Sequence, residues 1–252
     1  MCRRKTISLS FTEAGKHDRR ERRSLRLHAQ PICFPNGVLH AAEIFGRTQA
    51  LDIRPYNPGD RIQLLEETGG ILSFDERVMI STLRAMASDQ NLSFGFRPSI
   101  NVSMCTVEQD GFAVRTLGLL HQHNVDPSAI ILEMTETAPI QNRETAQKNL
   151  LTLQEAGVLL SLDDAGSGMS IAHRHLLVNW DYVKGDKKEV RALRPGGKPS
   201  PLFTHAIESA MARNAPIVFE GISTEELFRL ATEWQRENGN YRHLLFQGNP
   251  RP

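Results

Sequence analysis

Two adjacent aspartates, Asp163 and Asp164, end an apolar run and are followed at once by the glycine-rich stretch AGSGMS (165–170). If both were ionised and neither had a partner, the two carboxylates would repel each other. One interpretation is a simple acidic turn into a helix, because Asp, Gly and Ser are frequent turn formers. The other is a reaction centre in which bound cations hold the pair together.

Polar residues also interrupt or end the other apolar runs of the chain. The whole set is Glu43, Asn101, Glu133, Asp163, Asp164, Lys184, Glu220 and Gln247. A single acid in such a place is more often a helix cap or an ion-pair partner. A set this large, drawn from different runs, is harder to explain by capping. Carboxylates gathered in one cleft cannot all stay ionised without cations.

The chemistry of this set favours hard divalent cations. Carboxylate and amide oxygens, with no histidine or cysteine at corresponding positions, suit Mg²⁺ or Mn²⁺. Two adjacent aspartates can serve two metal ions, with one aspartate bridging the ions and the other binding the second ion only. A two-metal site with a nearby lysine is a general solution for phosphodiester hydrolysis, which makes this reaction the hypothesis that the residues suggest.

These side chains can meet only if the fold brings the ends of the apolar runs together. Strands are expected at 25–32, 38–46, 96–103, 129–134, 158–162, 182–185, 216–220 and 243–246. Helices are expected at 58–70, 73–91, 106–124, 142–157, 200–214 and 224–238, with Ser73 and Ser200 as N-caps and Pro201 at a first helical position. This alternation predicts the α/β class and a closed barrel, whose carboxyl rim would carry the polar set. An open doubly wound sheet is the alternative, although no GxGxxG follows the first strand.

Composition bounds the organisation of the chain. Its 252 residues, 40% of them hydrophobic, suffice for one large domain with a real core. Residues 1–24 are rich in Arg and Lys and are expected to form a flexible basic arm before a domain over 25–252. A solvated leader is favoured over a nucleic-acid-binding arm, since acidic residues are interspersed there. The net charge of +1 says little about partners.

Cysteine use and hydropathy predict a cytoplasmic protein. Cys2, Cys33 and Cys105 show no CxxC pairing, and such a sparse, odd set is typical of reduced thiols. No stretch approaches the roughly 20 apolar residues that span a bilayer, so no membrane span is expected. The beginning of the chain also lacks the apolar core of a secretory signal.

The order of the motifs resembles that of a known family. They are QPI at 30–32, EIFGR at 43–47, NVS at 101–103, LEMTE at 132–136, LDDAGSG at 162–168, KGD at 184–186, EGIS at 220–223 and QG at 247–248. In this order they resemble the EAL domain of bacterial cyclic di-GMP phosphodiesterases, from about Leu25 to the C-terminus. There are a few extra residues before Gln247. The resemblance implies a variant (β/α)₈ TIM-like barrel that hydrolyses cyclic di-GMP to linear pGpG with two Mg²⁺ or Mn²⁺ ions.

The resemblance also implies a role for each matching residue. The metal ligands would be Glu43, Asn101, Glu133, Asp163, Asp164 and Glu220, with Asp163 bridging the two ions. The catalytic residues would be Lys184, Glu220 and Gln247, with Lys184 assisting the attacking water and Gln247 orienting it. The substrate-binding residues would be Gln30, Arg47 and Asp186, while Glu136 would anchor the loop after the double aspartate.

Departures from the family pattern leave two functions open. The loop after the aspartates has Ala165 and Met169 in place of aromatic residues, and Ser223 stands where the family has a second glutamate. The complete set of acids favours an active phosphodiesterase. The altered loop and Ser223 instead suit a weak or inactive domain that acts as a cyclic di-GMP receptor or a protein-interaction module. The resemblance further implies a homodimer. Since no sensor module is visible, the regulatory input is expected to be another protein, the N-terminal arm or the level of expression.

Overall fold

The computed structural model describes residues 7–9, 25–48, 58–88, 97–135, 139–165, 177–194 and 196–248. Its strands are β1 (Ile7–Leu9), β2 (Leu25–Cys33), β3 (Leu39–Thr48), β4 (Arg97–Ser103), β5 (Ile131–Thr135), β6 (Leu159–Leu162), β7 (Tyr182–Gly185), β8 (Ile217–Phe219) and β9 (Leu244–Gln247). Its helices are α1 (Pro58–Thr68), α2 (Ile71–Ser88), α3 (Met104–Val107), α4 (Phe112–Gln122), η2 (Pro127–Ala129), α5 (Arg143–Glu155), α7 (Lys187–Ala192), α8 (Pro201–Ala212) and α9 (Glu225–Glu237). Strands β2 to β9 match the eight expected apolar runs to within two residues at either end.

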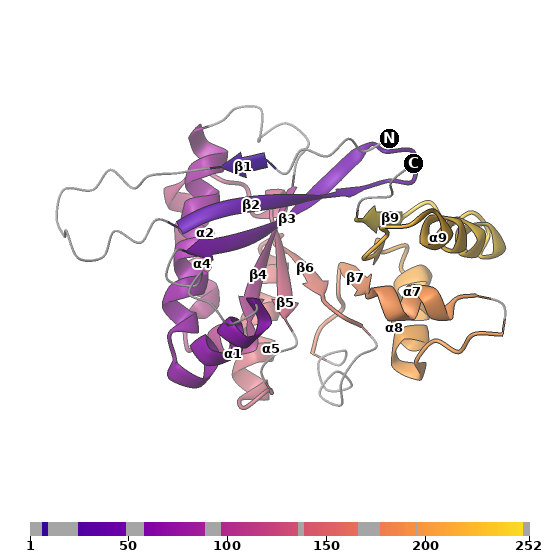
Figure 1. Ribbon diagram of the computed structural model, residues 1–252. Coiled ribbons are helices and arrows are strands. Elements are labelled where there is room, and N and C mark those ends of the chain that lie inside the picture. Colours follow the sequence, from indigo (N-terminus) through magenta and orange to yellow (C-terminus); the bar gives the residue numbers. More distant parts are fainter. Residues whose placement is uncertain are drawn as a thin grey trace.

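Strands β2 to β9 close into a barrel, and the described helices pack around its outside (Figure 1). From β3 to β9, neighbours in the chain pair in parallel. β2 closes the ring by pairing antiparallel with both β3 and β9, and β1 lies along the edge of β2 beyond the β9 contact. The predicted (β/α)₈ barrel is therefore confirmed, with its first strand reversed.

The reversal of β2 follows from its short connection to β3. Asn36 accepts a hydrogen bond from the Val38 N–H at 3.0 Å, and Gly37 takes a positive φ of 85°. The Phe34 N–H donates to the Val38 carbonyl at 2.9 Å and completes a tight turn. A parallel pair needs a crossover of a dozen or more residues, so a five-residue turn permits only an antiparallel hairpin.

An apolar layer fills one end of the barrel interior. Its buried members are Ile32, Ala41, Ile131, Tyr182, Val218 and Leu245, one from each of six strands. A second, larger apolar cluster lies between the outer face of the strands and the helices. In a strand, residues two apart point to the same face. The side chains that follow the inner layer by two positions therefore also point into the barrel, at its other end.

Helix boundaries show where the sequence-based expectations held and where they were wrong. Helix α8 begins as expected, since Ser200 accepts from the Phe203 N–H at 3.2 Å and Pro201 follows the cap. Ser73 is not a cap: the Phe74 N–H already donates to the Gly70 carbonyl at 3.1 Å, so α2 begins earlier, at Ile71.

Two further differences concern the number of helices. The single helix expected over 106–124 is divided into α3 and α4, because Gly111 takes a left-handed φ of 71° between them. Helix α7 was not expected. Its N-cap is Asp186, whose carboxylate accepts from the Lys188 and Glu189 N–H groups at 2.8 and 2.9 Å.

The structure differs from the expectation of three reduced thiols. Cys33, the last residue of β2, is disulfide-bonded, whereas Cys105 is a free thiol. Among the described helices, none is both long enough and apolar enough to cross a membrane. Two expectations fall outside the described residues: the role of Glu136, and the loop over 166–169. Of the predicted basic arm, only β1 is described.

Candidate active site

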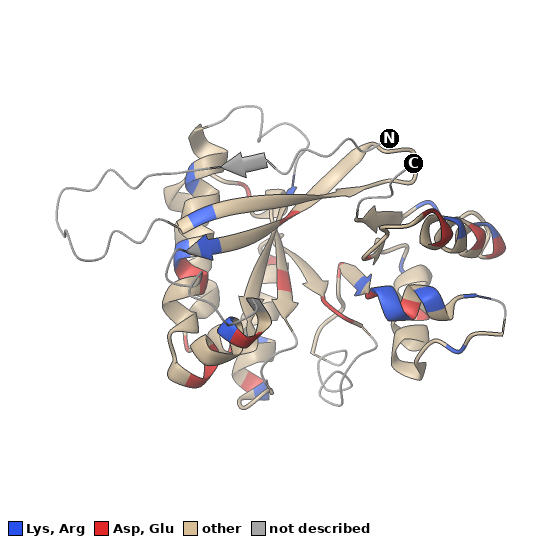
Figure 2. Ribbon diagram, in the orientation of Figure 1, with Lys and Arg blue, Asp and Glu red and all other residues tan. Residues whose placement is uncertain are grey.

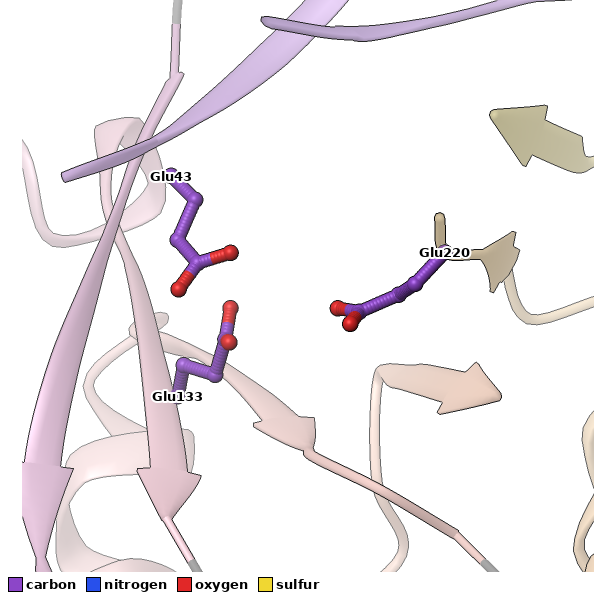
Figure 3. Close-up of side chains that lie close together, drawn as sticks. All are labelled: Glu43, Glu133 and Glu220. Atoms are coloured by element: carbon purple, nitrogen blue, oxygen red, sulfur yellow. The ribbon is translucent and has the colours of Figure 1, made fainter. Parts of the chain in front are cut away.

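The polar residues singled out in the sequence converge at one end of the barrel. Five of them lie two positions beyond a member of the inner apolar layer and so point into the barrel; these residues are Glu43, Glu133, Lys184, Glu220 and Gln247. Gln30 lies directly opposite Glu43 in the antiparallel β2–β3 pair and joins them from the reversed strand. Figure 3 shows the carboxylates of Glu43, Glu133 and Glu220 directed toward one another from three separate strands or strand ends.

The ammonium group of Lys184 lies at the centre of this cluster. Its Nζ contacts Glu43 Oε2 at 3.2 Å and Asp163 Oδ1 at 3.4 Å, and it forms close ion pairs with Glu133 and Glu220. The lysine side chain is only 2% exposed. An ammonium has three hydrogens to donate, so four carboxylates compete for them.

Hydrogen bonds from amides and a hydroxyl fix the two most buried acids. Asn101 Nδ2 donates to Glu43 Oε1 at 2.7 Å, and Gln247 Nε2 donates to Glu43 Oε2 at 2.5 Å. Ser99 Oγ donates to Glu133 Oε2 at 2.7 Å, while the other oxygen of Glu133 faces Lys184. Buried polar groups normally find such partners, and here they also set the direction of each carboxylate.

The adjacent aspartates are arranged by a backbone turn. Asp164 takes a left-handed φ of 45°, and its N–H donates to Asp163 Oδ1 at 3.0 Å. Oxygens of Asp163, Asp164 and Glu220 all lie within 4.8 Å of one another, as do those of Glu43, Glu133 and Glu220. Glu220 belongs to both groups, so the arrangement offers two neighbouring sets of oxygen ligands.

Burial raises the pKa values of three of these acids. Burial raises the pKa of Glu133 well above its usual value, and the charge of Glu43 adds to this. Burial likewise raises the pKa of Asp163, and it raises that of Glu220 to about 7 although Lys184 acts in the opposite direction. Burial therefore disfavours full ionisation of this group of acids.

The surroundings of Lys184 and Glu43 favour the charged forms of both side chains. Burial acts to lower the pKa of Lys184, but the surrounding carboxylates outweigh it and raise that pKa well above its usual value. Burial acts to raise the pKa of Glu43, but Lys184, Asn101 and Gln247 together lower it. A protonated lysine facing an ionised Glu43 follows from both shifts.

The donor set fits divalent cations. Five carboxylates (Glu43, Glu133, Asp163, Asp164 and Glu220) and one ammonium would leave four negative charges uncompensated, which is the charge of two divalent cations. The ligand atoms are oxygens, as Mg²⁺ and Mn²⁺ prefer. Gln247 Oε1 is buried and has no hydrogen-bond partner among the described residues, so one acceptor remains free beside the acids.

The cluster opens into a cavity of about 390 Å³. Its lining residues are Gln30, Glu43, Phe45, Asp163, Lys184, Glu220, Gly221 and Gln247. The sequence had singled out all of these except Phe45 and Gly221. Figure 2 shows the charged positions on the barrel strands as short isolated segments, in contrast with the mixed charges along α7 and α9.

Two other predicted site residues, Arg47 and Asp186, have different surroundings, and one residue of the site was not predicted. Arg47 does not line the cavity, but its guanidinium lies 5.2 Å from the centre of the Phe45 ring. Phe45 itself is one of the lining residues. The Asp186 carboxylate is engaged with the backbone at the start of α7. Ser99, which sequence reasoning missed, contacts Glu133; its only signal was a hydroxyl two residues before Asn101 in an apolar run.

The family model described as EAL domain matches residues 16–236. The bifunctional diguanylate cyclase/cyclic di-GMP phosphodiesterase MucR of Pseudomonas aeruginosa is 28% identical over 220 residues, which cover 83% of this chain and 31% of MucR. The cyclic di-GMP phosphodiesterase PdeF of Escherichia coli is 28% identical over 201 residues, which cover 80% of this chain and 27% of PdeF. The chain thus spans less than a third of the length of these relatives.

Solved structures give the same result for the fold. A structure described as PaMucR phosphodiesterase in complex with c-di-GMP has a TM-score of 0.71 and 25% sequence identity, and the match covers 88% of this chain and 92% of that one. The family-model match ends at residue 236, before Gln247. Gln247 thus lies outside the matched residues, and it is the hydrogen bond to Glu43 that places it in the site.

Proposed function

Because this chain belongs to the EAL domain family, we propose that it hydrolyses cyclic di-GMP to linear pGpG with two divalent cations, Mg²⁺ or Mn²⁺. The observation that carries the proposal is the buried Lys184 ammonium among four carboxylates at the floor of a cavity. The names of the relatives, and the c-di-GMP complex of one of them, support the choice of substrate.

Two neighbouring groups of carboxylate oxygens, which share Glu220, support the two-cation part of the proposal. The ligands are assigned as the family resemblance implies, with Asp163 as the shared residue. Glu43, Asn101, Glu133 and Asp163 would hold one cation, and Asp163, Asp164 and Glu220 the other. When bound, the cations would supply positive charge to the phosphate and lower the pKa of a water molecule.

The reaction needs one water and consumes one phosphodiester bond. The water oxygen forms a bond to phosphorus while the bond from phosphorus to the ribose 3′ oxygen breaks. One proton of the water passes to the leaving 3′ oxygen, and the linear product carries the 5′ phosphate. Lys184, kept protonated by its neighbours, would assist the attacking water by stabilising the negative charge that develops on its oxygen. Gln247 Oε1, which has no partner among the described residues, would accept a hydrogen bond from the water and orient it.

Substrate contacts would come from the rim of the cavity. Gln30 and Phe45 line it, and Arg47 lies over the Phe45 ring, within reach of a phosphate bound there. Asp186 stays a predicted substrate residue that would also hold the start of α7, next to the strand that carries Lys184.

The test is direct. The purified chain is incubated with cyclic di-GMP and Mn²⁺, and the products are separated by chromatography. We expect pGpG to form, and we expect Glu43→Ala and Asp163→Asn to abolish turnover. Unchanged rates in these two variants would refute the metal assignment.

A binding experiment separates the two functions left open by the altered loop and Ser223. Calorimetry measures whether the chain binds cyclic di-GMP in the presence of Ca²⁺. Binding without any pGpG at high enzyme concentration would reject the enzymatic proposal in favour of a receptor. Light scattering on the same sample tests the homodimer that the family resemblance implies, and a monomer would reject that part of the proposal.

A further inference from the structure

Two serines occupy equivalent places in the wall of the barrel but have different surroundings. Ser99 on β4 and Ser161 on β6 are each 1% exposed. They flank β5, the strand that carries Glu133. Ser99 Oγ donates to Glu133 Oε2 at 2.7 Å, whereas Ser161 Oγ has no hydrogen-bond partner in the part of the chain that the structure describes.

The contact with Ser99 gives the two carboxylate oxygens of Glu133 different partners. Oε2 accepts from Ser99, so Oε1 is turned toward Lys184 and the other acids. The terminal torsion of a glutamate is broad, so packing alone does not fix the plane of its carboxylate. One hydrogen bond to a buried hydroxyl does fix it.

Lys184 cannot supply the same restraint. Its ammonium is shared among four carboxylates, and its contacts change whenever a cation neutralises some of them. Ser99 lies beside Glu43 in the β3–β4 register and beside the apolar Ile131 in the β4–β5 register, but its hydroxyl donates to one carboxylate, that of Glu133. This hydrogen bond would persist when a cation is bound.

We propose that Ser99 is a positioning residue, which acts through Glu133 to preorganise the cation site. This inference rests on the proposed function for its catalytic consequence, but its structural part concerns cation binding alone. Partners of metal ligands of this kind typically contribute 10- to 100-fold in metal affinity or activity. A hydroxyl that merely satisfied its own hydrogen-bonding needs would contribute to stability only.

The experiment compares Ser99→Ala with its matched control, Ser161→Ala. Both remove one hydroxyl of equal burial from a strand beside β5, and Ser161 is the register neighbour of Glu133, but only the first variant removes a hydrogen bond to a carboxylate. Mn²⁺ is titrated calorimetrically into each metal-free protein at fixed pH. We expect Ser99→Ala to weaken Mn²⁺ binding about 10-fold or more, and Ser161→Ala to change it less than about 2-fold.

A third variant separates the hydrogen bond from the space that the side chain fills. Ser99→Cys keeps nearly the same volume but replaces the hydroxyl by a weak donor. We expect it to bind Mn²⁺ about as weakly as Ser99→Ala while its unfolding temperature without metal stays close to wild type. In hydrolysis assays at subsaturating Mn²⁺, kcat should fall in both Ser99 variants with little change in KM.

The outcomes are distinguishable from those of the proposed function. Weak Mn²⁺ binding by the Ser99 variants, in a chain that does not hydrolyse cyclic di-GMP, would support the positioning role and reject the reaction. Wild-type Mn²⁺ affinity in Ser99→Cys, or equal losses in Ser99→Ala and Ser161→Ala, would overturn the inference. So would a wild-type chain that binds no Mn²⁺.

Discussion

At the scale of single residues, the site depends on one cation of its own. Without bound metal, Lys184 is the ammonium that faces four carboxylates from within the barrel. Removing one partner of a buried ion pair leaves an uncompensated charge and costs about 3–5 kcal/mol. We therefore expect Lys184→Met, in the presence of EDTA, to lose about this much unfolding free energy at pH 8.

The loss should depend on pH with a definite sign. With the lysine gone, the pKa values of Glu133, Asp163 and Glu220 rise further, so their protonation stabilises the folded state as the pH falls. Urea unfolding at pH 8 and pH 5.5 should show the deficit shrinking at the lower pH. Lys188→Met, which removes an exposed lysine from α7, is the control and should change little. Equal stability of Lys184→Met and wild type at pH 8 would contradict the buried-charge account.

The sequence predicted the charged members of the site because they stand out at the ends of apolar runs. Glu43, Glu133 and Lys184 are charged residues in otherwise apolar strands, and the structure brings them together. Ser99 could not be found in this way. A hydroxyl within a strand is unremarkable in a sequence, and its partner Glu133 becomes visible only when the register of β4 and β5 is known.

At the scale of elements, Gly185 sets how closely α8 approaches β7. A Cβ at this position would lie 2.2 Å from Phe203 Cε2, and Phe203 is fully buried. We expect Gly185→Ala to cost about 1–3 kcal/mol by overpacking. Because the residue adjoins Lys184, turnover should fall as well. Thermal unfolding and the pGpG assay measure both effects.

Gly118 provides the matched comparison. It lies exposed within α4, and a Cβ there would meet nothing within 4 Å. We expect Gly118→Ala to stabilise the protein by about 0.5–1 kcal/mol, since alanine favours helix more than glycine does. If Gly185→Ala behaved like Gly118→Ala, the close approach of α8 to β7 would be disproved.

A buried carboxyl on α2 makes the packing of elements sensitive to pH. Asp75 Oδ2 accepts from the Ser103 N–H at 3.0 Å and from Thr106 Oγ1 at 2.6 Å, which ties α2 to β4 and α3. Burial raises the pKa of Asp75 to about 7, and the charge of Glu66 adds to this. The folded state thus holds a proton that the unfolded state has released. Its stabilising effect is complete below the usual pKa and is lost as the pH rises through about 7.

Asp75→Asn isolates this contribution. Both donors bind the same oxygen, so an amide can keep the two hydrogen bonds without a charge. Relative to wild type, we expect the variant to gain about 1–3 kcal/mol of unfolding free energy between pH 5 and pH 8. Urea unfolding with saturating Mg²⁺ is the measurement, because bound cations keep the site acids from titrating. Parallel stability curves for the two proteins would contradict the shift.

The elements themselves were predictable where one local signal dominated. Apolar runs gave the strands of the barrel, and Ser200 with Pro201 gave the start of α8. The division between α3 and α4 was missed because Gly111 reads as an ordinary residue in an amphipathic segment until its left-handed φ is seen. The reversal of β2 was open to prediction in principle, since five residues are too few for a parallel crossover.

At the scale of the whole molecule, cation binding should stabilise the entire barrel. The ligands come from separate strands and strand ends, so the unfolded chain cannot present them together. At a concentration 100 times its Kd, a cation adds about 2.7 kcal/mol. Since 1 kcal/mol corresponds to about 2–4 °C in a chain of this size, Mn²⁺ should raise the unfolding temperature by about 5–10 °C over EDTA.

The same scan on Glu133→Gln gives the control. This change removes one charge from the ligand set while keeping the shape of the side chain, so most of the rise caused by Mn²⁺ should disappear. An exposed acid at a turn, replaced as Asp126→Asn, should leave the rise intact. A rise of equal size in all three proteins would mean that Mn²⁺ binds elsewhere.

The residues of the site also take part in closing the barrel between β2 and β9. β2 meets β9 through the pairs Ile32 with Gln247 and Cys33 with Phe246. Over that junction, Gln247 reaches Glu43 on the far side of β2, 204 positions away along the chain. The residue that would orient the attacking water therefore also connects the two sides of the junction that closes the barrel. Separation of β9 from β2 would remove Gln247 from the site even if every carboxylate stayed in place. A ligand that binds the site would in turn stabilise the closed barrel.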